Sequence, residues 1–104
     1  MATAYYSHAE CRLHDMGAGH PECPQRLDAI EDRLLITGLD HALERREPTP
    51  APLSDVELAH DRMFVASLRG LSDRLIEDML AGGPSHASVD PDTAINRHTW
   101  EAAL

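Results

Sequence analysis

Segments that favour a β-strand are scarce in this chain of 104 residues. Residues 4–7 contain two aromatic side chains and precede a polar stretch, which is typical of a short buried strand. Residues 48–52 place a proline at every second position, so they fit either an edge strand or a plain linker. One or two strands do not form a stable sheet by themselves. The chain therefore favours an α/β class of fold in which other strands complete the sheet.

Helical patterns occupy most of the remaining sequence. The clearest one runs from Pro24, which suits a first helical turn, to Gly38, which suits a helix end. Between them, apolar residues recur at helical spacing: Leu27, Ile30, Leu34 and Leu35. We expect residues 39–46 to add one or two further helical turns.

Three more helices are expected in the second half of the chain. The Ser-Asp-Val-Glu sequence of residues 54–57 has the form of a capping box and predicts a short helix that begins there. Asp61 is expected to cap a second helix and Ser72 a third, which the Gly-Gly-Pro sequence of residues 82–84 would end. The apolar residues of these two helices form two groups: Phe64, Val65 and Leu68, then Leu75, Ile76, Met79 and Leu80.

Two loops and a final helix account for the rest. Residues 8–19 and 84–93 show no clear period and are rich in His, Asp, Ser, Gly and Pro. A helix is expected to start at Asn96 or Thr99 and to continue toward Leu104. No stop signal follows that helix, so we expect these residues to be the first part of a larger α/β domain.

Charge and hydropathy exclude several classes of partner. Nine basic residues against eighteen acidic ones give a formal net charge of -9, which repels nucleic acid and anionic membranes. The first residues do not form a basic region followed by an apolar run, and no stretch reaches the length of a membrane span. The two cysteines are expected to be free thiols. We therefore expect a soluble cytoplasmic protein.

Residues 17–27, with the sequence Gly-Ala-Gly-His-Pro-Glu-Cys-Pro-Gln-Arg-Leu, form the most distinctive motif. This string resembles the channel loop and first helix of the histone deacetylase and acetylpolyamine amidohydrolase family. Further segments resemble the same family in the same order: residues 5–8 with Cys11, residues 14–17, residues 60–68, residues 90–93 and residues 100–104. The order and spacing of these segments carry the resemblance. Cys23 departs from the family, which usually has a basic residue at that place.

The resemblance implies a fold and an activity. The fold would be the N-terminal part of an arginase/deacetylase-like three-layer α/β domain, mostly helical over residues 1–104, with the catalytic half absent. The whole domain would hydrolyse acetylated lysine or acetylated polyamine amides with a bound zinc. In the family, two Asp and one His hold the zinc, a His pair moves protons and a Tyr stabilises the oxyanion. This chain has no His-His pair and no Asp-x-His sequence, so we expect it to hold no zinc and to be inactive alone.

Four residues take a site role from the resemblance. Arg26 matches the arginine that lines the internal cavity beneath the metal, where a guanidinium attracts the leaving acetate. Alternatively, Arg26 pairs with Glu22 on the helix surface. Asp92 matches the rim aspartate that accepts hydrogen bonds from the substrate, and otherwise is a turn residue. His20 and Pro21 would form one wall of the substrate channel, or merely end a loop.

Three other interpretations remain open. The first is a zinc site in the N-terminal loop, where His and Cys recur at metal-ligand spacings: His8, Cys11, His14, His20 and Cys23. The second is a metal-dependent phosphohydrolase that uses a His-Asp pair, suggested by the His-Asp sequences at residues 14–15 and 60–61. His60 itself is expected to have a structural role at a helix junction. The third is a self-associating or partner-binding module, which would use the exposed face of an incomplete core.

Overall fold

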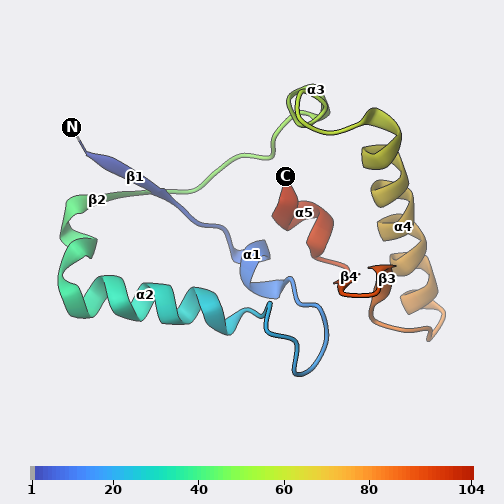
Figure 1. Cartoon of the computed structure of the whole chain (residues 1–104), viewed down its shortest axis with the longest axis horizontal. Coiled ribbons are helices and arrows are strands. Elements are labelled where there is room, and N and C mark those ends of the chain that lie inside the picture. The colour runs from blue at the N-terminus through green and yellow to red at the C-terminus, as the bar shows by residue number, and fades with distance from the viewer. Residues whose placement is uncertain (1) are drawn as a thin grey trace.

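The computed structural model describes residues 2–104 and mixes helices with short strands, in agreement with an α/β class in general (Figure 1). In chain order its elements are β1 (Thr3–Tyr6), α1 (Ala9–Leu13), α2 (Gln25–Thr37), the 3-10 helix η1 (Leu39–Ala42), β2 (Leu43–Arg46), α3 (Leu53–Val56), α4 (Arg62–Leu80), β3 (Ala87–Asp90), β4 (Thr93–Ile95) and α5 (Thr99–Ala103).

The strands β1 and β2 form a parallel pair, with Thr3 opposite Leu43 and Tyr6 opposite Arg46. A parallel connection needs a crossover, and α1, α2 and η1 supply it. The prediction of helical turns over residues 39–46 was therefore wrong for its second half. Residues 43–46 find backbone partners in β1, and this pairing overrides their local preference. Residues 47–52 have no regular structure, which confirms the linker and not the edge strand.

Helix α2 has the ends that the sequence predicts. It begins at Gln25, directly after Pro24, and it ends before Gly38, whose φ of 77° is the left-handed conformation that favours glycine. Arg45 of β2 holds this helix against the parallel pair, because its guanidinium binds Glu31 at 2.7 Å and also pairs with Asp40. The same guanidinium lies 5.1 Å from the centre of the Tyr5 ring.

Helix α3 begins earlier than expected, and the predicted capping box is wrong. Pro52 precedes the first helical residue, Leu53, and no side chain caps this end. The fixed φ of proline suits a helix start, so Pro52 sets the boundary and Ser54 lies inside the helix. Glu57 instead accepts a hydrogen bond from Arg62 at 3.2 Å.

Helix α4 is a single helix of 19 residues. Asp61 caps it as predicted, since its carboxylate accepts the backbone N–H groups of Met63 and Phe64. The expected break at Ser72 was wrong: Ser72 lies within the helix and is 3 % exposed, because it faces the apolar side of α4. The predicted end is confirmed, since α4 stops at Leu80 and Gly82 then has a φ of 86°.

Both segments expected to be loops contain short regular elements. Residues 8–19 contain α1, which His8 caps by accepting the N–H of Glu10 at its Nδ1 atom. Residues 84–93 contain β3 and the start of β4, which pair as an antiparallel hairpin. Elements of three to five residues carry too little periodicity to be recognised in sequence. The last helix starts at Thr99, one of the two predicted positions.

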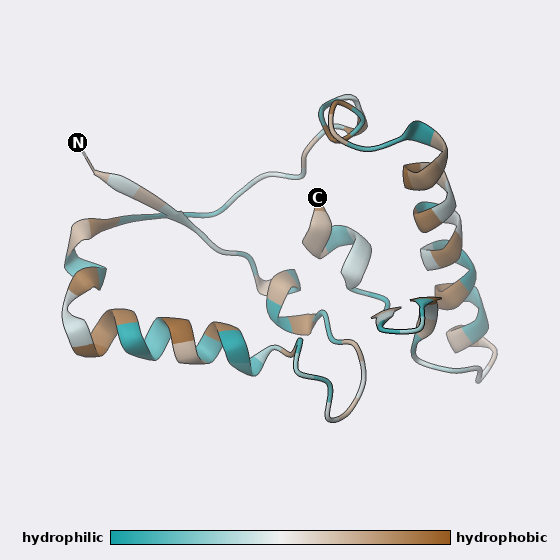
Figure 2. Cartoon of the chain, viewed as in Figure 1, coloured by the Kyte–Doolittle hydropathy of each residue, from teal (hydrophilic) through white to brown (hydrophobic). Residues whose placement is uncertain are grey.

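The molecule is more open than a folded protein of its size. Its radius of gyration is 16.0 Å, whereas about 13 Å is expected for a domain of this length. The buried apolar residues are Val65, Leu75 and Ile95. Hydrophobic and hydrophilic residues alternate around α2 and α4 (Figure 2), yet several apolar side chains remain exposed: Leu35, Ile36, Leu39, Leu58, Met63 and Leu80. Within residues 2–104, none of the helices combines the length and hydrophobicity that crossing a bilayer requires.

Candidate functional site

The loop between α1 and α2 (residues 14–24) and the β3–β4 turn meet through His20. The Nε2 atom of His20 lies 3.1 Å from the backbone oxygen of Asp92, although 72 residues separate the two. The Nδ1 atom of His20 accepts the N–H of Glu22 at 3.0 Å. In the neutral ring Nε2 therefore carries the proton, and its N–H donates a hydrogen bond to the backbone oxygen of Asp92. The two loops together line an open hollow: Met16, Ala18, Gly19, His20, Pro21 and Asp92.

The turn that carries Asp92 is held from within. Asp90 accepts the backbone N–H of Asp92 at 2.9 Å, and this hydrogen bond lowers the pKa of Asp90 below its ordinary value. Asp90 thus stays ionised and fixes the turn, while the side chain of Asp92 is exposed at the rim of the hollow. An exposed carboxylate in that position is able to accept hydrogen bonds from a ligand N–H.

Arg26 lies apart from this hollow. It sits in the first turn of α2, and its Nη2 atom donates to Glu22 at 2.6 Å, which is the ion pair considered as the alternative role. Arg26 also lines a second cavity of about 290 Å³, which lies between α1, the start of α2 and α5. Three of the four predicted site residues are therefore brought together, and the fourth lies beside another cavity.

A polar network that the sequence did not reveal anchors the loop between α1 and α2. The buried Asn96 donates from Nδ2 to the backbone oxygen of Leu13 at 2.7 Å and to Asp15 at 3.1 Å. Asp15 also accepts the N–H of Gly17 at 3.0 Å and lies 2.5 Å from Nε2 of His86. The hydrogen bond with His86 lowers the pKa of Asp15. This network fixes the start of the loop to the segment between β4 and α5 and to the α4–β3 connection.

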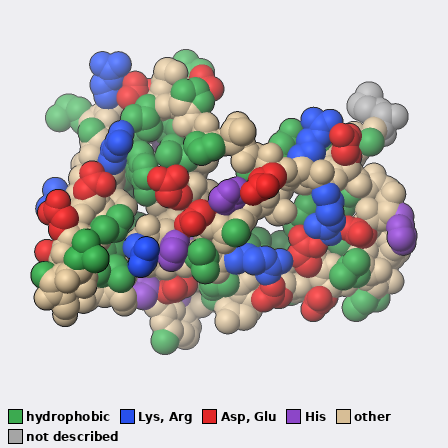
Figure 3. Space-filling model, turned by 180° about the vertical axis from the view of Figure 1, so that it is seen from behind, with side chains coloured by type: hydrophobic (Ala, Val, Ile, Leu, Met, Phe, Trp, Pro, Cys, Tyr) green, Lys and Arg blue, Asp and Glu red, His purple; other side chains and the backbone are tan. Residues whose placement is uncertain are grey.

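Two more histidine contacts join the N-terminal loop to the end of the chain. His98 contacts Glu10 at 2.8 Å through Nδ1, and His14 contacts the hydroxyl of Thr99 at 2.7 Å. Figure 3 shows histidine side chains among acidic and basic ones in the middle of the molecule. Residues more than 80 positions apart give no spacing signal, so these contacts were not predictable from local sequence.

The three histidines of the N-terminal loop have different partners. His8 caps α1, His14 faces Thr99 and His20 faces Asp92. Across residues 2–104, no three His, Cys, Asp or Glu side chains are placed to hold a metal ion. None of the described side chains thus forms the ligand group that the zinc site considered in the loop would need.

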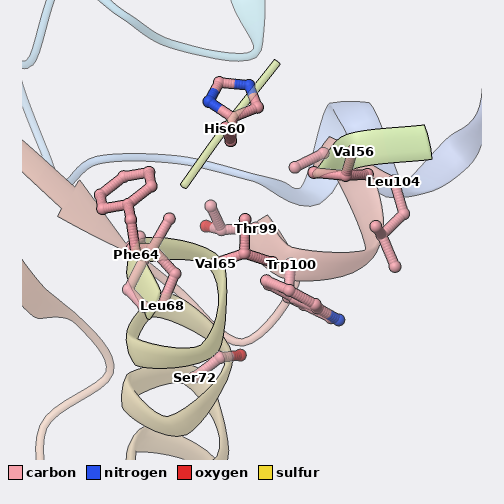
Figure 4. Close-up of a pocket in the computed structure, with 11 residues that line it drawn as sticks. Val56, His60, Phe64, Val65, Leu68, Ser72, Thr99, Trp100 and Leu104 are labelled. Atoms are coloured by element: carbon pink, nitrogen blue, oxygen red, sulfur yellow. The ribbon is translucent and has the colours of Figure 1, made fainter. Parts of the chain in front are cut away.

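An apolar pocket of about 250 Å³ lies between α3, α4 and α5 (Figure 4). Phe64, Leu68 and Trp100 supply much of its lining, with His60 at one side. The His60 ring lies 6.4 Å from the Phe64 ring, directly before the cap of α4. This position fits the structural role expected for His60.

Comparison with known proteins adds no family. The sequence matches no family model and no curated protein. The resemblance to deacetylases thus remains a prediction that rests on the motifs of the chain.

Proposed function

We propose that this chain forms one wall of the substrate channel in a zinc-dependent, deacetylase-type amide hydrolase that acts on acetylated lysine or acetylated polyamines. The observation that carries the proposal is the contact between His20 and Asp92 at 3.1 Å. The resemblance assigns these residues, far apart in sequence, to the wall and the rim of one channel. Their convergence on one hollow supports that assignment.

The charge of the hollow suits the proposed substrates. The exposed carboxylate of Asp92 would accept hydrogen bonds from an amide or amine N–H at the rim, and His20 with the rigid Pro21 would form the adjoining wall. A net charge of -9 favours the approach of a cationic polyamine or a lysine-rich peptide. Substrate recognition at the rim would therefore be both directional and electrostatic.

Arg26 would act on the product side. Its guanidinium has five N–H donors, and the pairing with Glu22 occupies only part of them. The remaining donors leave room for a small carboxylate in the cavity that Arg26 lines. Zinc supplies the Lewis acid and activates water in enzymes of this type, and residues outside this segment would have to hold it.

The proposal is tested by amide hydrolysis. The longest product of the coding sequence should release acetate from an acetyl-lysine peptide and lose this activity when zinc is chelated. Asp92→Ala should raise KM by about tenfold, as expected for the loss of about 1.4 kcal/mol of substrate hydrogen bonding. Asp73→Ala, an exposed change on α4, should leave KM unchanged. The proposal fails if zinc-loaded protein does not hydrolyse acetyl-amides, or if the two variants behave alike.

A second candidate function, self-association, is favoured by the exposed apolar surface. The solvent-accessible surface of the chain is 7535 Å². A folded protein of this mass is expected to expose roughly 5,800 Å², so the excess is about 1,700 Å². About 800 Å² per partner is enough for a standard protein interface. The parallel pair β1–β2 is also largely exposed, whereas parallel sheets are nearly always covered on both faces.

Sedimentation velocity separates the two candidates. Self-association predicts that the sedimentation coefficient of residues 1–104 rises with concentration, and that Leu80→Glu and Ile36→Glu suppress this rise. Both side chains are largely exposed, so these substitutions should not unfold the monomer. A concentration-independent monomer would exclude self-association and would leave the hydrolase proposal intact.

A further inference from the structure

Ser85, His86 and Asp15 form a linear hydrogen-bonded chain outside the hollow described above. The hydroxyl of Ser85 lies 2.8 Å from Nδ1 of His86. The other ring nitrogen, Nε2, lies 2.5 Å from Oδ1 of Asp15, which is 71 residues away in sequence. A nucleophile that contacts a base, which in turn contacts a carboxylate, is the arrangement that activates serine in hydrolases.

The carboxylate determines the tautomer of His86. An ionised carboxylate only accepts hydrogen bonds, so Nε2 of the neutral ring carries the proton and its N–H donates a hydrogen bond to Asp15. Nδ1 is then the acceptor, and the Ser85 hydroxyl donates to it. This is the tautomer in which the ring is able to take the hydroxyl proton.

Asp15 is firmly positioned for this task. Its Oδ1 accepts the N–H of Gly17 at 3.0 Å, and its Oδ2 accepts Nδ2 of Asn96 at 3.1 Å. Asn96 is itself buried and fixed to the backbone oxygen of Leu13. The hydrogen bond with His86 lowers the pKa of Asp15, which keeps the carboxylate ionised at neutral pH.

We propose that Ser85 is a nucleophile, with His86 as its general base and Asp15 as the residue that positions His86. In the reaction, Oγ of Ser85 attacks an acyl or phosphonyl centre, the Oγ–C or Oγ–P bond forms, and the hydroxyl proton passes to Nδ1 of His86. The bond from that centre to the leaving group breaks; an alkoxide takes the proton from His86, whereas fluoride leaves as the anion and His86 releases the proton to solvent. Water then attacks an acyl-Ser85 and gives a proton to His86, and Oγ leaves and is protonated again.

The surroundings of Ser85 define the substrate class. Ser85 is exposed in the turn between α4 and β3, and none of the cavities described for residues 2–104 includes it. Because its hydroxyl is exposed, small activated esters or fluorophosphonates should reach Ser85 and react. General-base assistance is worth roughly 10² to 10⁴ in rate, so the reactivity of Ser85 should stand clearly above that of other serines.

Labelling with a fluorophosphonate, followed by peptide mass spectrometry, tests the proposal in the full chain. Ser67 and Ser88 are matched controls, because their hydroxyls are exposed and donate to backbone oxygens at 2.8 Å without a histidine base. Ser85 should be labelled about 100-fold faster than either control. His86→Gln should reduce the labelling of Ser85 to the rate of the controls, with an unchanged circular dichroism spectrum.

Asp15→Asn tests the positioning role. The amide would offer an N–H to Nε2, which favours the wrong tautomer, so labelling should slow by at least about tenfold. Asp15→Glu keeps a carboxylate and should restore part of the lost labelling rate, which a purely structural role of Asp15 does not predict. The proposal is overturned if Ser85 reacts no faster than Ser67 and Ser88, or if His86→Gln leaves its rate unchanged.

Discussion

The cap of α4 gives the sharpest test of how this fold is held together. Asp61 accepts two backbone N–H groups, from Met63 at 2.9 Å and from Phe64 at 3.1 Å. Asp61→Ala leaves both donors without a side-chain acceptor, and loss of such a cap typically costs about 1 kcal/mol. Among residues 2–104 three apolar side chains are buried, and α4 carries two of them, Val65 and Leu75. Loss of the cap should therefore destabilise the whole fold.

Urea denaturation followed by far-ultraviolet circular dichroism measures the effect. With a slope near 1 kcal/mol per molar urea, as for small proteins, the midpoint for Asp61→Ala should fall by about 1 M. The melting temperature should fall by about 4–8 °C. Asp61→Asn keeps an acceptor oxygen but loses the charge near the helix dipole, so it should cost only about 0.3–1 kcal/mol.

Ser54→Ala is the matched control for this prediction. Ser54 also has the sequence form of a cap, but in α3 no side chain caps the first turn. Its substitution should change the free energy of unfolding by less than about 0.5 kcal/mol. If Asp61→Ala has no effect, or if Ser54→Ala costs as much, the assignment of helix starts given above is incorrect.

Three further predictions follow from single residues. Gly38→Ala should destabilise the fold by about 1 kcal/mol, because the φ of Gly38 is 77°. Gly70→Ala lies within α4 and should stabilise the fold by about 0.5–1 kcal/mol. The melting temperatures of the two variants should therefore shift in opposite directions. Leu75→Ala should cost about 2–5 kcal/mol in urea unfolding, while the exposed Leu80→Ala should be nearly neutral. The lowered pKa of Asp15 in the folded state stabilises the fold above the pKa of about 4 that this group has in the unfolded chain, and the stabilisation is lost as the pH falls through the folded-state pKa. When the pH is lowered from about 5 to about 3, the free energy of unfolding of Asp15→Asn should therefore decrease less than that of the unmodified chain.

Helix α2 and both ends of α4 were predictable because their signals are local. Helix α2 has Pro24 at its start, a glycine at its end and apolar residues at helical spacing between them. The cap of α4 at Asp61 was predictable for the same reason. Ser72 misled the prediction because a serine in a helix and a serine at a cap look alike in sequence, and only its burial decides between them.

The contacts between distant segments were not predictable from the residues alone. Strand β2 forms because it pairs with β1, about 40 residues earlier. The network of Asp15, His86 and Asn96 depends on how three segments pack, and no spacing rule encodes it. The contact of His20 with Asp92 was not predicted either: the resemblance assigned the two residues to the wall and the rim of a channel, and that assignment stays a prediction.

The claim that the hollow at His20 and Asp92 binds acetylated amines is tested most directly by titrating the ¹⁵N-labelled chain with acetylputrescine and, separately, with putrescine. Acetylputrescine should shift the amide resonances of residues 17–21 and 90–93, and Asp92→Ala should abolish these shifts. Putrescine has a second ammonium group in place of the acetylated amine, so it measures the purely electrostatic attraction to the acidic chain. Shifts that survive Asp92→Ala, or shifts confined to other parts of the chain, would contradict the account.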